Sequence, residues 1–170
     1  MRAAFLLVTV AGAALAQNPL SADTKTAWNG LKDYLVRAAA KMPEEHYGFK
    51  PAPEVKTYGQ MLGHIADAQY MLCSLAAGEK RAPAEVEKTK TSKADVTAAL
   101  QDSIRYCDGV YDALTDARAA ETVKLFGRER SRLGALMTNL THSWEHYGNL
   151  VTYLRIKGIV PPSSEPKPGR

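Results

Sequence analysis

The segment Ser131-Arg-Leu-Gly-Ala-Leu-Met-Thr-Asn-Leu-Thr-His-Ser-Trp-Glu-His-Tyr-Gly-Asn-Leu-Val-Thr-Tyr-Leu-Arg-Ile-Lys157 is the longest helical pattern in the chain. Its apolar residues recur every three to four positions, which is the period of an amphipathic α-helix. They are Leu133, Leu136 or Met137, Leu140, Trp144, Leu150 or Val151, and Leu154. Gly158 and then Pro161-Pro162 follow, and these residue types end helices. We therefore predict a helix from Ser131 to Lys157.

Two histidines occupy one face of this segment. At about 100° per residue, His142 and His146 lie only about 40° apart in projection. Asn149 falls in the same arc, and Glu145 lies at its edge. Buried polar side chains of this kind need a partner, because each costs roughly 1–3 kcal/mol when unsatisfied. One metal ion shared by both imidazoles would provide that partner.

Three further helices are predicted towards the N-terminus, separated by loops. The first runs from Ser21 to Lys41, and the second starts at the capping-box residue Thr57 and stops at Gly78. The third starts at Ser92 and reaches Leu114. Residues 79–90 are polar and read as a loop, while Thr122–Phe126 is either a short strand or extended chain. Four helices without a convincing set of strands predict an all-α fold, a four-helix bundle.

A third histidine, His64, lies in the second predicted helix, within Met61-Leu-Gly-His-Ile-Ala-Asp67. An imidazole from a facing helix would complete a three-His site, which leaves coordination positions open for water or substrate. Asp67 follows His64 by three residues on an adjacent part of the same face, so Asp67, Glu145 and Asn149 are candidates for supporting the ligands. We treat His46 as non-ligating. The metalloprotease order H-E-x-x-H is absent, because Glu145 adjoins the second histidine of the pair rather than the first.

The N-terminal residues have the features of a secretory signal peptide. A basic start is followed by an apolar run and by Ala14-Leu15-Ala16, a small-x-small cleavage site. The run is shorter than the roughly 20 residues that a transmembrane helix needs. We predict a signal peptide over 1–16, one domain over 17–162 and a disordered tail over 163–170. An uncleaved anchor or an ordinary first helix is the alternative at the N-terminus, and periplasmic and extracellular destinations stay open.

Charge and cysteine content narrow the function classes. The net charge of +4 is small and dispersed, and no aromatic residues interleave with the lysines near Lys90, so we expect no nucleic-acid partner.

Outside the cytoplasm the two cysteines, Cys73 and Cys107, are able to form a disulfide. Two free buried thiols are slightly favoured over that bridge, since cysteine is often a small core residue. Neither cysteine is proposed as a metal ligand.

Three stretches of this sequence resemble a known family. The run Leu140-Thr-His-Ser-Trp-Glu-His-Tyr-Gly-Asn-Leu-Val-Thr-Tyr-Leu-Arg-Ile-Lys-Gly-Ile-Val-Pro-Pro162 is similar to the C-terminal signature of the DinB/YfiT-like metalloenzymes. Tyr58-Gly-Gln-Met-Leu-Gly-His-Ile-Ala-Asp67 resembles the motif of that family's second helix. Met42-Pro-Glu-Glu-His-Tyr-Gly-Phe-Lys-Pro51 resembles the usual approach to that helix. The resemblance spans about Leu20 to Pro162.

The resemblance implies an up-down-down-up four-helix bundle with one histidine ligand from the second helix and two from the fourth. Those positions match His64, His142 and His146, and none of them is missing. Members of the family include thiol S-transferases, a glutathione- or mycothiol-dependent isomerase and hydrolase-like proteins. The metal varies among them, so we expect zinc or nickel first, with manganese or iron as alternatives. Three imidazoles suit several of these ions.

These expectations define two functional hypotheses. The first is an exported, divalent-metal-binding protein that acts as a metal-dependent hydrolase or transferase on an unknown small molecule. Export disfavours a thiol-transferase role, because those thiol cosubstrates are cytoplasmic. The alternative is a non-catalytic envelope binding or structural protein in which the metal only stabilises the bundle or mediates a homodimer. In neither hypothesis does the mature chain contain an integral membrane segment.

Overall fold

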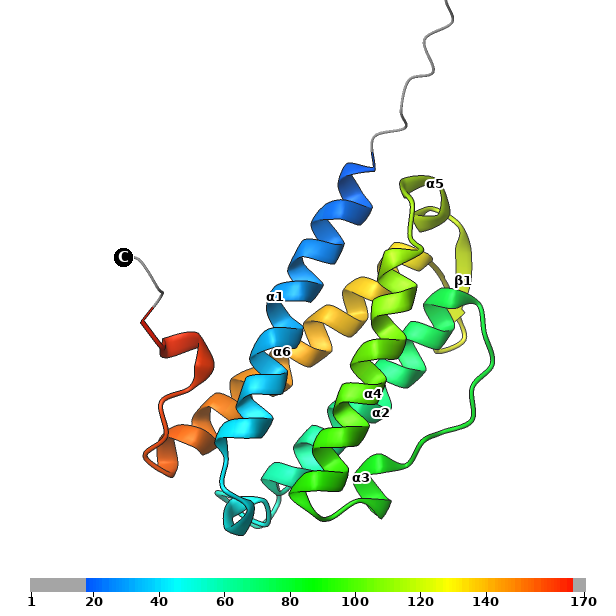
Figure 1. Cartoon of the computed structure of the whole chain (residues 1–170). Coiled ribbons are helices and arrows are strands. Elements are labelled where there is room, and N and C mark those ends of the chain that lie inside the picture. Colours follow the sequence, from blue (N-terminus) through cyan, green and yellow to red (C-terminus); the bar gives the residue numbers. More distant parts are fainter. Residues whose placement is uncertain (1–17, 167–170) are drawn as a thin grey trace, which may run out of the picture.

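The computed structural model describes residues 18–166 and is mostly helical (Figure 1). The predicted signal peptide, 1–16, lies outside the described residues. The elements follow in the order α1 (Pro19–Lys41), η1 (Glu44–His46), α2 (Tyr58–Ala77), α3 (Val86–Thr89), α4 (Lys93–Asp112), α5 (Asp116–Ala119), β1 (Thr122–Leu125), β2 (Arg128–Ser131), α6 (Arg132–Ile156) and η2 (Pro162–Ser164). Four of the described helices are long, as the sequence pattern predicts.

Local capping chemistry sets where the long helices begin. Thr57 and Gln60 form a reciprocal capping box at the start of α2. The hydroxyls of Ser92 and Ser131 accept hydrogen bonds from the third backbone N–H of α4 and of α6. Gly78 ends α2 in the left-handed conformation, with φ +79°, which a residue without Cβ adopts at little cost. These boundaries agree with the sequence pattern to within about two residues.

The core lies between α1, α2, α4 and α6. Trp28 of α1 stacks on Tyr111 of α4 with 4.9 Å between ring centroids. Fully buried large side chains from all four long helices surround this pair: Leu31, Leu35, Leu62, Ile65, Leu72, Leu100, Leu136 and Leu150. Trp144 departs from the predicted apolar stripe of α6, because it is 41% exposed and packs edge-on against Tyr34. An aromatic ring on a helix surface can still bury one of its sides in this way.

The connection between α2 and α4 differs from the predicted loop. It contains the one-turn helix α3, which packs against α2, and Val86 is its single buried residue. Figure 1 shows the chain leaving the far end of α2 and running back along the bundle before α4 begins. The segment 79–92 thus covers one side of α2.

A β-hairpin precedes α6. In the stretch Thr122–Phe126, which the pattern leaves open between strand and extended chain, Thr122–Leu125 forms β1, which pairs antiparallel with β2 in the register Thr122↔Ser131. Phe126 and Gly127 make the turn with φ of +49° and +77°. Two consecutive positive φ angles are the geometry of tight hairpin turns, and glycine at one of them lowers their cost.

Cys73 and Cys107 are joined by a disulfide that links α2 to α4. The slight preference for two free thiols is therefore wrong. Both residues do lie in the core with no exposed surface, as that interpretation required. Their Cα atoms are 5.5 Å apart, a separation that helix packing produced and that sequence spacing cannot reveal.

The described residues that follow α6, up to residue 166, pack against α1. The turn η2 occupies part of the segment predicted to be disordered, and the carboxylate of Glu165 pairs with Arg37 and Lys41. Residues 167–170 of that predicted tail lie outside the described part. Among residues 18–166, no helix is both long and apolar enough to cross a membrane.

Candidate metal centre

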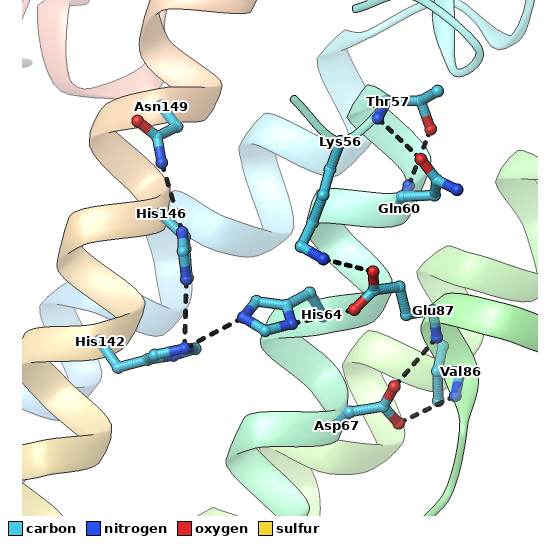
Figure 2. A network of polar contacts seen from close by, with 10 residues as sticks. All are labelled: Lys56, Thr57, Gln60, His64, Asp67, Val86, Glu87, His142, His146 and Asn149. Carbon is cyan, nitrogen blue, oxygen red and sulfur yellow. Dashed lines mark hydrogen bonds and ion pairs between the residues drawn. The ribbon is translucent and has the colours of Figure 1, made fainter. Parts of the chain in front are cut away.

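Helices α2 and α6 bring three histidines together on their facing sides (Figure 2). The Nε2 atom of His142 lies 3.2 Å from Nε2 of His64 and 3.1 Å from Nε2 of His146. One ring nitrogen from each residue lies within 4.8 Å of the other two. The capping of α2 at Thr57 fixes His64 in the second turn of that helix, opposite the middle of α6. The three residues singled out from the sequence thus form one cluster in space.

The spacing of the nitrogen atoms suits a shared ion. Nitrogen ligands at roughly 2.0–2.1 Å from a tetrahedral metal lie about 3.3 Å from one another. The observed separations of 3.1 and 3.2 Å are close to that value. Three imidazole nitrogens that face one point cannot all be satisfied by hydrogen bonds among themselves, because a neutral ring has one donor and one acceptor. A divalent cation satisfies all three lone pairs together, so the residues fit such a group.

The environment keeps two of these imidazoles neutral. Burial, and after it the neighbouring charges of His146 and His64, lower the pKa of His142 to about 4 against the opposing effect of Glu145. Burial also lowers the pKa of His146, helped by the charge of His64. A metal ligand must be the unprotonated ring, so a low pKa keeps both residues ready to bind near neutral pH.

The second nitrogen of each ring has a different partner. Nδ1 of His64 lies 3.0 Å from a carboxylate oxygen of Glu87 in α3. The side-chain amide of Asn149 lies 3.3 Å from Nδ1 of His146. Nδ1 of His142 is buried and has no hydrogen-bond partner among residues 18–166. Such contacts fix the orientation of a ligating ring and decide which nitrogen carries the proton.

The three supporting residues predicted from the sequence occupy different positions. Asn149 contacts His146 directly. Asp67 instead accepts hydrogen bonds from the backbone N–H groups of Val86 and Glu87, at 2.8 and 3.0 Å, and so anchors α3 to α2 (Figure 2). Glu145 is exposed and influences the histidines through its charge alone. Their roles at the metal stay a prediction.

Sequence reasoning missed two polar residues of this region, Glu87 and Lys56. The carboxylate of Glu87 bridges the ammonium of Lys56 and the ring of His64. Both lie in stretches that the pattern assigns to loops, where charged residues are ordinarily solvated. One available signal was Val86, an isolated aliphatic residue in a polar run, which is buried against α2 with 4% exposure.

A pocket of about 610 Å³ begins at His64 and His142 and extends along α2 beneath residues 79–85. Met71 and Leu75 line it from α2. Aromatic contacts hold its outer wall, because the Arg81 guanidinium lies 4.1 Å from the ring centre of Tyr70 and 4.9 Å from that of Tyr106. The volume falls within the usual range for small-molecule sites.

Comparison with known proteins places this helical bundle with its three-His cluster in a family. The family model of the DinB superfamily matches residues 27–150. The chain therefore belongs to the DinB superfamily. It is also 22% identical, over 123 residues, to the uncharacterized protein YjoA of Bacillus subtilis strain 168. That match covers 71% of this chain and 79% of YjoA.

Solved structures share the fold. A DinB-like protein from Bacillus cereus ATCC 10987 matches with a TM-score of 0.72 and 18% identity, over 82% of this chain and 93% of the other. A variant of mycothiol-dependent maleylpyruvate isomerase matches with a TM-score of 0.65 and 14% identity, over 76% of this chain and 60% of the other. Identities this low support a common fold and carry no statement about the reaction.

Proposed function

We propose that the protein is a divalent-metal-binding member of the DinB superfamily and acts as a metal-dependent hydrolase or transferase on a small molecule. The observation that carries the proposal is the meeting of the Nε2 atoms of His64, His142 and His146 at separations that suit one ion. Zinc and nickel are the first candidates, because imidazole ligands suit both. The proposal includes an up-down-down-up order of the long helices, supported by the long connection between α2 and α4.

The site's own residues divide the work. When bound, a divalent ion supplies Lewis acidity towards a carbonyl oxygen or a water molecule. His64, His142 and His146 hold it, and their number leaves coordination positions open. A substrate in the pocket would lie against His64 and His142, and Met71 and Leu75 would contact its apolar part. The pocket favours an enzyme over the alternative of a purely structural metal, since a structural site is normally closed by protein ligands.

Export is part of the proposal. The apolar N-terminal run with its small-x-small site motivates it. The disulfide between Cys73 and Cys107 supports it, because such bonds persist mainly in oxidising compartments. Cell fractionation shows which compartment contains the protein, and mass spectrometry of the protein from each fraction shows where its chain begins. A mature chain starting near Gln17 in the exported fraction is the expected result, and an intact N-terminus in the cytoplasm contradicts it.

Metal analysis tests the central claim. The protein is purified without chelators beside His142→Ala, and beside His46→Ala as a matched control, since His46 lies in η1 outside the cluster. We expect about one metal ion per chain in the unmodified protein and in the control, and loss of the ion in His142→Ala. Hydrolysis of small esters and amides by the loaded protein is then measured. Absence of metal in all three proteins after exposure to zinc, nickel and manganese contradicts the proposal.

A further inference from the structure

We propose that Glu87 is a positioning residue that fixes the proton of His64 on Nδ1 and so aims the Nε2 lone pair of His64 at the metal. This inference rests on the proposed function. An ionised carboxylate accepts hydrogen bonds and donates none, so the contact of 3.0 Å between Oε2 of Glu87 and Nδ1 of His64 requires the proton on Nδ1. A neutral ring then leaves Nε2 unprotonated, 3.2 Å from Nε2 of His142.

Two residues of α2 determine the position of the short helix α3. Asp67 lies one turn after His64 and accepts hydrogen bonds from the N–H groups of Val86 and Glu87. Gly63 precedes His64, and a Cβ at that position would lie 2.8 Å from the Cα of Glu87. Asp67 holds the backbone of α3 beside His64 (Figure 2). α3 reaches that position only because Gly63 has no side chain. The same stretch of α2 thus supplies the ligand His64 and the contacts that position Glu87 beside it.

Lys56 holds the other carboxylate oxygen of Glu87. The ion pair with Lys56 keeps this carboxylate ionised, while its other oxygen contacts Nδ1 of His64. The backbone carbonyl of Lys56 in turn accepts a hydrogen bond from the Tyr153 hydroxyl of α6 at 2.7 Å. The carboxylate is thus charged and held from two sides, which leaves the ring of His64 little freedom to rotate.

The other two histidines lack an anionic partner of this kind. His146 faces the neutral amide of Asn149, and Nδ1 of His142 has no partner in the described part of the chain. A carboxylate behind an imidazole raises its basicity as a ligand, and removal of such a partner typically lowers metal affinity roughly 10–100-fold. We therefore assign to Glu87 an effect of that size on zinc affinity, acting through His64.

The experiment compares the full chain with Glu87→Ala and Glu87→Gln, and with Glu54→Gln as a control, since Glu54 is exposed on the neighbouring loop. Long-range nitrogen–proton NMR of the histidine rings in the metal-free proteins reports the tautomer of His64. Competition against a chelating indicator measures zinc affinity. Circular dichroism confirms that each variant is folded, and Glu87→Gln preserves the side-chain volume if the alanine variant is disturbed.

We expect the Nδ1-protonated form of His64 in the unmodified and control proteins, and a mixture of tautomers in Glu87→Ala. Zinc affinity should fall about 10–100-fold in Glu87→Ala and by less in Glu87→Gln, whose carbonyl oxygen still accepts the hydrogen bond. An Nε2-protonated His64 in the unmodified protein, or unchanged tautomer and affinity in both variants, overturns the inference. A Glu87-dependent tautomer in a protein that binds no metal refutes the proposed function and the effect of Glu87 on zinc affinity, and it leaves only the assignment of the His64 proton to Nδ1 standing.

Discussion

Gly63 of α2 lies directly against the backbone of Glu87 in α3. A Cβ added at Gly63 would lie 2.8 Å from the Cα of Glu87 and 2.9 Å from its nitrogen, and backbone atoms cannot swing away as the end of a long side chain can. Protein interiors are packed too closely to absorb such an overlap without movement. This contact therefore decides whether α3 can stay beside His64.

Gly63→Ala should push α3 away from α2. Overpacking of this kind costs typically 1–3 kcal/mol, and here it should also weaken zinc binding by separating Glu87 from His64. Thermal unfolding and zinc titration measure the two effects. Gly30→Ala is the control, because a Cβ at Gly30 in α1 meets nothing within 4 Å and alanine is the better helix former. Equal stability and zinc affinity for Gly63→Ala and the unmodified protein would mean that the close contact does not constrain α3.

Removal of the metal should lower the melting temperature. An ion that binds only the folded chain stabilises it by about 2.7 kcal/mol when its free concentration is one hundred times the Kd. For a chain of this size that corresponds to a shift of roughly 5–10 °C. Differential scanning calorimetry with buffered zinc and with chelator measures the shift, and His142→Ala should abolish it. An identical melting temperature under both conditions argues for a metal-free bundle.

Reduction of the disulfide should destabilise the bundle without emptying the metal centre. Cys73 and Cys107 close a loop with a sequence separation of 34, for which the stabilisation is about 2–4 kcal/mol. Denaturant unfolding of the oxidised protein and of the double variant Cys73→Ala/Cys107→Ala gives the difference. Metal content should be equal in the two proteins, because neither sulfur belongs to the histidine cluster. A loss of metal in the double variant contradicts that separation of roles.

Acid should weaken the attachment of α1 through Asp116. Its carboxylate accepts hydrogen bonds from the N–H groups of Leu20 and Ser21 and from the Ser21 hydroxyl, where the first turn of α1 has its positive dipole end. Desolvation raises the pKa of Asp116, but these hydrogen bonds outweigh it, and the pKa lies below its ordinary value of 3.8. The folded state thus favours the ionised carboxylate. Its stabilisation is complete above the unfolded pKa and is lost as pH falls through the lower folded pKa.

Asp116→Ala should therefore lower the melting temperature at pH 7, and the difference from the unmodified protein should shrink as the pH approaches 3. Asp112→Ala is the control, because it removes an exposed ion pair with Lys25, and such pairs contribute little. Melting curves between pH 3 and pH 7 provide the comparison. A difference that is constant across this range would show that the charge of Asp116 has no part in the effect.

The long helices could be predicted from the sequence because their signals are local. Thr57, Ser92 and Ser131 cap the helices that follow them, and the apolar period continues through each helix. The hairpin strand β2 was missed, since Arg128–Ser131 is polar and is defined by pairing with β1 alone. The disulfide depended on the packing of α2 against α4, which no local pattern records.

The candidate site was predictable in part for the same reason. His142 and His146 share a face by helical period, His64 was a candidate from a facing helix, and the family resemblance matched all three to ligand positions. Glu87 depends on α3, and α3 depends on the tertiary contact with Asp67 and on the missing side chain of Gly63. Single-turn helices have little intrinsic stability, so their position is decided by the surface on which they lie.

The cross-links of the molecule are unevenly distributed. Cys73 ties α2 covalently to α4, and His64 faces the two histidines of α6, so an ion there would tie α2 to α6 as well. Over its whole described length, α1 has no such cross-link: it is held by packing around Trp28, by the polar contacts of Trp28 and Lys32 with Asp108 of α4, and by polar contacts at its ends. We therefore expect α1 to detach from the bundle more easily than the other long helices. In the oxidised, metal-loaded protein the amide protons of α1 should exchange with solvent through a partial unfolding that leaves α2, α4 and α6 folded.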